Sequence, residues 1–140
     1  MTLLIDAGPL VGLAEAGEPN RERILDVMHA EPGALVIPAP VTAEVDYLLG
    51  RHFGRPARRA FLRDLAAGRF TVACLEGEDH ARVAELDARY EALDLRLADC
   101  AIVVLAQRHQ TTRILTFDER HFRAVTPLAG GAFTILPLDA

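Results

Sequence analysis

Four acidic residues stand close to the ends of short apolar stretches, and their types and spacing could serve metal chemistry. Two of them directly follow an apolar stretch, and the other two lie near the start of a stretch with helical character. Carboxylates that converge repel one another unless a cation lies between them, and oxygen-rich clusters suit hard divalent cations such as Mg²⁺ or Mn²⁺. The four candidates are Asp6, Glu44, Asp99 and Asp118.

The elements that must position these acids follow from the apolar pattern. Short apolar stretches bounded by Gly or Pro predict strands, whereas longer stretches with helical spacing predict helices. This alternation favours a three-layer α/β/α sandwich with a central, mainly parallel sheet, formed by residues 1–140 as a single domain. The predicted strands are 3–5, 34–37, 70–75, 113–117 and 133–136, and the predicted helices are 9–16, 21–29, 41–52, 56–67, 78–93 and 97–108.

This topology predicts that the four acids share one edge of the sheet. Asp6 and Asp118 end strands, and Glu44 and Asp99 fall in the first turns of helices, with Thr42 as the expected helix cap before Glu44. Parallel sheets bind ligands beyond the carboxyl ends of their strands, which is this edge. Taken singly, Glu44 and Asp99 could stabilise helix N-termini, and Asp118 could be a turn residue. Asp6 is harder to explain in this way, because a charge directly after a buried strand is costly without a partner.

Composition and the absence of certain motifs exclude several other enzyme classes. All fifteen basic residues are arginine, so mechanisms that need a lysine, including that of a phosphorelay receiver domain, are excluded. A phosphatase of the haloacid dehalogenase type would need Asp-x-Asp after the first strand, where this chain has Gly8. The GxGxxG motif of dinucleotide-binding domains is absent as well. The net charge of −5 includes the four candidate acids, so it does not argue against a polyanionic substrate.

The location of the protein is also predicted from the apolar pattern. No apolar run approaches the length of a membrane span, and the N-terminus lacks the basic region of a signal peptide. We therefore expect a cytoplasmic protein that does not contact membranes.

Four segments around the acids resemble the motifs of PIN-domain ribonucleases, the fold used by VapC-type toxins of bacterial toxin–antitoxin pairs. The segments read LIDAGPL around Asp6, PVTAEV around Glu44, DLRLADCAIV around Asp99 and ILTFDERHF around Asp118. Their order, spacing and strand context make the match fairly specific, and it spans nearly the whole chain. One departure is Gly8, where the family often has Ser or Thr. Thr116 could supply the missing hydroxyl from another strand.

The resemblance implies an endoribonuclease that cleaves RNA with metal-activated water and leaves 5′-phosphate and 3′-hydroxyl ends. Asp6, Asp99 and Asp118 would hold Mg²⁺ or Mn²⁺, and Glu44 would contact the metal through water or orient the nucleophile. The resemblance also implies a small antitoxin protein as partner and a homodimer, with the helical pair 41–67 taking part in these contacts.

Further residues could assist, each with a plainer alternative. Asp94 could make an outer contact to the metal or could cap a turn. Arg120 and His121 could contact an RNA phosphate or could lie in a solvated loop. A different class of function stays open as well, namely a PIN-like module that has lost catalysis and binds RNA or protein. A metal titration would distinguish it, since such a module need not bind Mg²⁺ or Mn²⁺.

Overall fold

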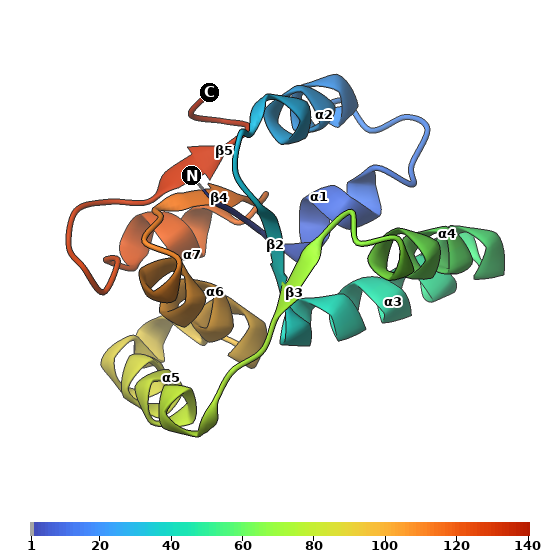
Figure 1. The fold of residues 1–140 in the computed structure, drawn as a ribbon. Coiled ribbons are helices and arrows are strands. Elements are labelled where there is room, and N and C mark those ends of the chain that lie inside the picture. Colours follow the sequence, from blue (N-terminus) through green and yellow to red (C-terminus); the bar gives the residue numbers. More distant parts are fainter. Residues whose placement is uncertain (1) are drawn as a thin grey trace.

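The computed structural model describes residues 2–140 and has a central sheet covered by helices on both faces (Figure 1). All strand pairs are parallel, and the strand order is β3-β2-β1-β4-β5. This confirms the predicted three-layer α/β/α sandwich with a mainly parallel sheet. The strands are β1 (Leu3–Ile5), β2 (Leu35–Pro38), β3 (Thr71–Ala73), β4 (Arg113–Leu115) and β5 (Thr134–Leu136).

The strand order explains why the helices divide into two layers. The chain crosses the sheet in one direction from β1 to β3, and it then returns through β4 to β5 in the other direction. Because such crossovers are right-handed, the connecting helices of the two halves lie on opposite faces (Figure 1). The first layer holds α1 (Ala7–Gly12), α2 (Arg21–Ala30), α3 (Ala39–Phe53) and α4 (Arg55–Ala66). The second holds α5 (Gly77–Arg89), a 3₁₀ turn (Glu91–Leu93), α6 (Leu97–Arg108) and α7 (Glu119–Ala124).

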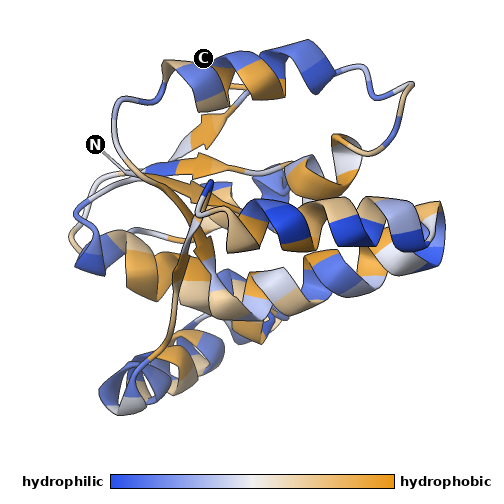
Figure 2. Cartoon of the chain, turned by 45° about the vertical axis from the view of Figure 1, so that its right-hand side comes forward, coloured by the Kyte–Doolittle hydropathy of each residue, from blue (hydrophilic) through white to orange (hydrophobic). Residues whose placement is uncertain are grey.

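The core lies between the sheet and the two helical layers. Every residue of β1 is buried, and α6 contributes an unbroken buried stretch from Cys100 to Ala106. Figure 2 shows the strands in hydrophobic colours, whereas the outer faces of several helices are hydrophilic. A helix that is apolar on all sides must be buried, so α6 is held firmly against the sheet. Within residues 2–140, the structure has no helix with both the length and the apolar character that crossing a bilayer requires.

Two helices begin earlier than predicted, and in both a proline that the prediction placed at or before the start of the helix lies inside the first turn. We expected a helix from residue 9 and another from residue 41, but α1 begins at Ala7 and α3 at Ala39. Proline fits the first helical turn, where its missing N–H would have no partner, so Pro9 and Pro40 lie inside these helices. Both helices therefore start directly at the carboxyl ends of β1 and β2.

The predicted helix cap at Thr42 is consequently wrong. Thr42 lies inside α3, and its hydroxyl donates to the carbonyl oxygen of Ala39 at 2.6 Å. Glu44 accordingly stands in the second turn of α3 and not in the first, as we had expected. Glu44 still lies near the carboxyl end of β2, and therefore at the edge of the sheet where it was expected.

The segment after Asp118 is a helix, although the sequence pattern predicted none there. The strand β4 ends at Leu115 and not at residue 117, and α7 follows Asp118 directly. Asp118 caps this helix by accepting a hydrogen bond from the backbone N–H of His121 at 3.0 Å. Phe122 anchors the helix in the core, where its ring meets that of Phe133 edge to face. Arg120 and His121 therefore do not lie in a solvated loop.

Candidate active site

The four predicted acids stand on four elements that meet at the carboxyl edge of the sheet. Asp6 directly follows β1, and Asp118 follows β4, which pairs with β1. Asp99 is the third residue of α6, and Glu44 lies on α3. The charges of Asp99 and Glu44 both act on Asp6, and that of Asp118 acts on Asp99. Each of the four acids therefore interacts electrostatically with at least one other, through the pairs Asp6–Glu44, Asp6–Asp99 and Asp99–Asp118.

Thr116 connects two of these acids. The register of β1 and β4 pairs Ile5 with Leu115, so the next residues, Asp6 and Thr116, are neighbours. The buried Thr116 hydroxyl donates to Asp6 Oδ2 at 2.7 Å and accepts a hydrogen bond from the backbone N–H of Asp118 at 3.0 Å. The backbone N–H of Ala7 donates to Asp6 Oδ1 at 2.8 Å. Both oxygens of Asp6 are therefore oriented by the protein.

Burial makes these carboxylates costly to ionise. It raises the pKa of Asp6 from 3.8 to about 6, although the hydrogen bonds from Thr116 and Ala7 act in the opposite direction. Burial also raises the pKa of Asp99, and the charge of Asp118 raises it further, against the lowering effects of the Arg96 N–H and of His121. Two neighbouring carboxylates with raised pKa values are typical of a functional site.

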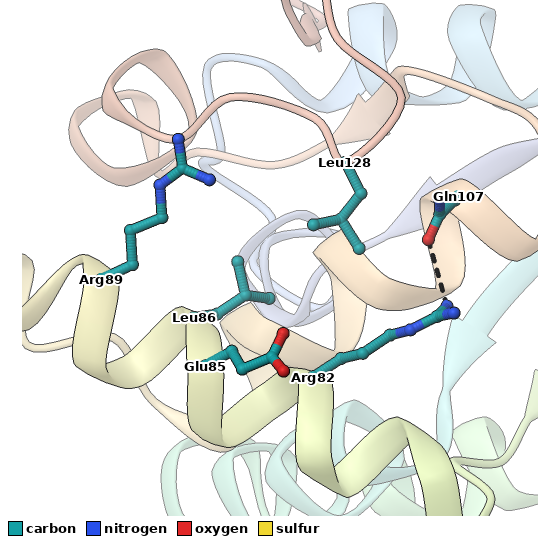
Figure 3. Close-up of a pocket in the computed structure, with 6 residues that line it drawn as sticks. All are labelled: Arg82, Glu85, Leu86, Arg89, Gln107 and Leu128. Atoms are coloured by element: carbon teal, nitrogen blue, oxygen red, sulfur yellow. Dashed lines mark hydrogen bonds between the residues drawn. The ribbon is translucent and has the colours of Figure 1, made fainter.

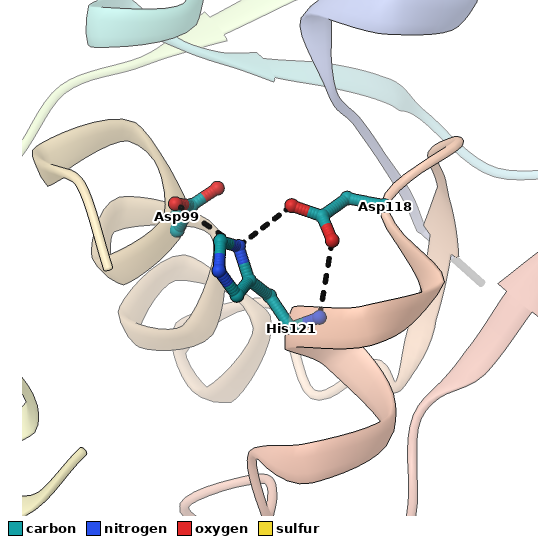
Figure 4. A group of neighbouring side chains, drawn as sticks. All are labelled: Asp99, Asp118 and His121. Carbon is teal, nitrogen blue, oxygen red and sulfur yellow. Dashed lines mark hydrogen bonds and ion pairs between the residues drawn. The ribbon is translucent and has the colours of Figure 1, made fainter. Parts of the chain in front are cut away.

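His121 lies closest to two of the acids (Figure 4). Its Nδ1 lies 2.7 Å from Asp118 Oδ2 and 3.7 Å from Asp99 Oδ2. Ligand atoms of Asp99, Asp118 and His121 all lie within 4.8 Å of one another, so they could hold one metal ion. From the sequence, His121 was a candidate for RNA contact and was not expected in this group. The spacing of three residues from Asp118 would have placed both on one helix face, had the helix been predicted.

The remaining sequence candidates, Arg120 and Asp94, are both exposed. Arg120 is exposed on α7, beside a shallow depression lined by Phe117, Asp118 and Arg123. Asp94 is also exposed, and it ends the 3₁₀ turn in a left-handed conformation with φ of 51°. Asparagine and aspartate tolerate that conformation better than most residues. This geometry fits a turn residue at Asp94, whereas the side chain of Arg120 is open to solvent.

The structure offers a physical reason for Gly8. A Cβ atom at this position would lie 3.1 Å from Cδ2 of Phe117, so the aromatic ring occupies the space that a side chain would need. Thr116, next to Phe117, provides the hydroxyl that contacts Asp6. The departure from the family pattern at Gly8 is thus accompanied by a hydroxyl from Thr116, which directly follows the neighbouring strand β4.

Gly8→Ser is expected to be tolerated. Phe117 is 42% exposed, so its ring can move by the few tenths of an ångström that a new Cβ requires. Glycine inside a helix also costs up to about 1 kcal/mol relative to better helix formers, which offsets part of the crowding. Thermal unfolding should therefore show a change in stability of less than about 1 kcal/mol. A loss of several kcal/mol would mean that Phe117 is held more rigidly than its exposure indicates.

A separate hollow between α5 and α6 lacks the features of an active site (Figure 3). Across it, Arg82 donates a hydrogen bond to Gln107 Oε1 at 3.1 Å. None of the four predicted acids lines it. Its lining residues are Arg82, Glu85, Leu86, Arg89, Gln107 and Leu128. The acidic edge therefore remains the candidate site.

Comparisons with known proteins identify both the sequence and the fold. The family model of the PIN domain matches residues 3–126. Ribonuclease VapC26 of Mycobacterium tuberculosis is 36% identical over 135 residues, which cover 96% of this chain and 100% of that protein.

Solved structures of low sequence identity share the fold. VapC20 of Mycobacterium tuberculosis, described as a toxin that cleaves the sarcin-ricin loop, has a TM-score of 0.76 at 16% identity and covers 84% of this chain and 91% of its own. VapBC2 of Rickettsia felis, bound to a DNA fragment of its promoter, has a TM-score of 0.71 at 16% identity, with 96% and 98% covered. A toxin–antitoxin complex from Klebsiella pneumoniae has a TM-score of 0.65 at 22% identity, with 89% and 97% covered.

Proposed function

The chain belongs to the PIN-domain family that includes the VapC ribonucleases, and from this premise we propose that it is a divalent-metal-dependent endoribonuclease of the toxin type. The observation that carries the proposal is the convergence of Asp6, Glu44, Asp99 and Asp118 at one sheet edge, with the pKa of Asp6 raised to about 6. In this proposal the activity resides in a single domain of residues 1–140. Its RNA substrate would place it in the cytoplasm.

The donor set fits a hard divalent cation. The acids offer oxygen ligands, and Nδ1 of His121 is buried without a hydrogen bond of normal geometry. Between two carboxylates this nitrogen needs a positive charge beside it, which a proton or a bound metal ion can supply. Asp6, Asp99 and Asp118 would hold Mg²⁺ or Mn²⁺. When bound, the ion would offset their charges and acidify the attacking water.

The protein's own groups would orient the reactants. Thr116 and the Ala7 N–H hold the two oxygens of Asp6 in place. Glu44 would accept a hydrogen bond from the attacking water and orient it toward the phosphorus. Arg120 would bind a non-bridging phosphate oxygen, a task for which a planar guanidinium is well suited.

The purified protein is expected to cleave RNA in Mg²⁺ or Mn²⁺ and to lose this activity in a chelator. Asp99→Asn should lower the rate by about 10²-fold or more, because it removes a charge that the ion requires. Cleaved RNA should carry 5′-phosphate ends, which sequencing of ligated ends would detect. Asp87→Asn makes the same chemical change on an exposed face of α5 and serves as the control. Full cleavage by Asp99→Asn, purified free of other ribonucleases, would contradict the proposal.

The proposed partners are a small antitoxin protein and a second copy of this chain. An apolar groove between α1, α3 and α4 supports a protein contact at the helical pair that the family resemblance indicated. Leu13, Leu49, Phe61 and Phe70 contribute to its lining. Two of the structurally similar proteins were solved as toxin–antitoxin assemblies.

The alternative is a binding module that has lost catalysis. The presence of all four acids argues against it, and a Mg²⁺ titration distinguishes the active nuclease from the inactive module.

A further inference from the structure

We propose that His121 is a nitrogen ligand of the divalent ion and binds it through Nδ1, beside Asp99 and Asp118. The inference rests on the proposed metal-dependent function. It gives His121 a role that the acidic motifs do not include, and it changes the expected metal preference of the site.

The first argument concerns the tautomer of the imidazole ring. Nε2 of His121 lies 2.9 Å from the carbonyl oxygen of Leu93. A carbonyl oxygen can only accept, so Nε2 must carry the proton and donate. In a neutral ring this leaves Nδ1 with a free lone pair. Histidines that bind metals usually have this arrangement, with the second ring nitrogen donating to a carbonyl or carboxylate.

The second argument concerns where Nδ1 lies. The atom is buried and lies 2.7 Å from Asp118 Oδ2 and 3.7 Å from Asp99 Oδ2, yet it makes no hydrogen bond of normal geometry. The His121 side chain as a whole is only 16% exposed. Nδ1 can face these two carboxylates only with a cation between them, which is either a proton on Nδ1 or a metal ion bound by all three groups. A divalent ion takes the place of that proton and, with twice its charge, also offsets the repulsion between Asp99 and Asp118.

The third argument is that the local backbone holds these groups in position. The N–H of His121 donates to Asp118 Oδ1, which leaves Oδ2 facing the imidazole ring of the same helical turn. Phe122, the next residue, is buried in the core and fixes the orientation of α7. Two donors are thus preorganised before an ion arrives, which lowers the entropic cost of binding it.

A nitrogen donor alters the selectivity of the site. Mg²⁺ favours oxygen ligands, whereas imidazole suits the transition metals, among which Mn²⁺ also accepts carboxylates. The protein is therefore expected to bind Mn²⁺ more tightly than Mg²⁺. Removing Nδ1 should weaken Mn²⁺ binding by about tenfold or more and weaken Mg²⁺ binding less.

Pulsed electron paramagnetic resonance of the Mn²⁺-loaded protein tests the ligand directly, without any activity measurement. Electron spin echo envelope modulation detects ¹⁴N nuclei bound to Mn²⁺. Wild-type protein should show this modulation, and protein made with ¹⁵N-histidine should show the ¹⁵N pattern instead. The labelling arm needs no substitution, so it stands even if a variant fails to fold.

Substitution then identifies the residue. In His121→Gln the side-chain amide can still donate to Leu93, as Nε2 does, but the variant has no atom at the position of Nδ1. It should fold normally by circular dichroism, lose the nitrogen modulation and bind Mn²⁺ more weakly by isothermal titration calorimetry. His80→Gln, at an exposed position of α5, is the matched control and should keep both signals.

The outcomes separate this proposal from the function on which it rests. Mn²⁺ binding that depends on Asp99 but shows no histidine nitrogen would overturn the role of His121 and leave the proposed metal-dependent function intact. Modulation that persists in His121→Gln would also overturn it, since another nitrogen would then be the ligand. Failure of the protein to bind Mn²⁺ at all would overturn both proposals.

Discussion

Replacing Asp6 by asparagine is expected to abolish RNA cleavage and, at neutral pH, to stabilise the protein when no metal is present. Cleavage should fall by about 10³-fold, because the variant loses a partly buried negative charge that the ion requires. Asparagine keeps the size of the side chain and can still accept the hydrogen bond from Thr116, but its NH2 group then faces the backbone N–H of Ala7, which offsets part of the gain in stability. A cleavage assay on RNA in Mg²⁺ measures the first effect, and thermal unfolding in a chelator measures the second.

The gain in stability follows from the raised pKa of Asp6. That pKa is about 6 in the folded protein and 3.8 in a free side chain, so the folded state holds a proton that the unfolded chain has released. The resulting stabilisation is complete below pH about 4 and is lost as the pH rises through about 6. At neutral pH, Asp6→Asn should therefore raise the free energy of unfolding of the metal-free protein by about 1 to 3 kcal/mol. Near pH 4 the two proteins should differ little.

Mg²⁺ should reverse this order. An ion that binds the folded state alone stabilises it, so wild-type protein should melt at a higher temperature in Mg²⁺, whereas Asp6→Asn should respond weakly. Asp87→Asn, on an exposed face of α5, controls for the loss of one negative charge. If metal-free Asp6→Asn melts below wild type at neutral pH, the buried carboxylate is not the source of strain that we infer.

Replacing Thr116 by valine is expected to cost both activity and stability, although the two side chains have nearly the same shape. The hydroxyl donates to Asp6 and accepts from the N–H of Asp118, and its residue is only 2% exposed. Its removal leaves two polar groups without their partner, which costs about 1 to 3 kcal/mol. Cleavage should fall about 10- to 100-fold, as is typical when a group that orients a metal ligand is lost. Thermal unfolding and RNA cleavage measure the two effects.

The pH dependence of this variant distinguishes positioning from simple structural damage. The hydrogen bond from Thr116 lowers the pKa of Asp6, so its loss should raise that pKa above about 6. Protons would then compete with the metal ion for Asp6 over a wider pH range. The pH at which Mn²⁺ binding reaches half its plateau should therefore rise. Thr116→Ser keeps the hydroxyl and should restore both the rate and the wild-type midpoint. An unchanged midpoint in Thr116→Val would rule out the positioning role.

Much of the fold could be predicted because it depends on patterns that are local in the sequence. The apolar stretch of α6 was predicted with its observed bounds, since a helix buried on all sides is apolar throughout. Asp6 was expected after a buried strand, and it follows β1 directly. Errors arose where local rules have exceptions, as with Pro9 and Pro40, which fit inside first helical turns. The short helix α7 was missed because the packing of Phe122 against Phe133 holds it in the core, and the local sequence pattern does not show this contact.

The sequence by itself determined which acids stand at the ends of strands and helices, and therefore at which edge of a parallel sheet they must lie. The order of residues along the chain is enough for this prediction, because the edge at which a parallel strand ends depends only on the direction of the strand. Tertiary structure decided what the edge can do. The register of β1 and β4 joins Asp6 to Thr116, burial raises the pKa of Asp6, and α7 turns His121 toward Asp99. Such contacts between segments distant in the sequence depend on packing, which no local pattern encodes.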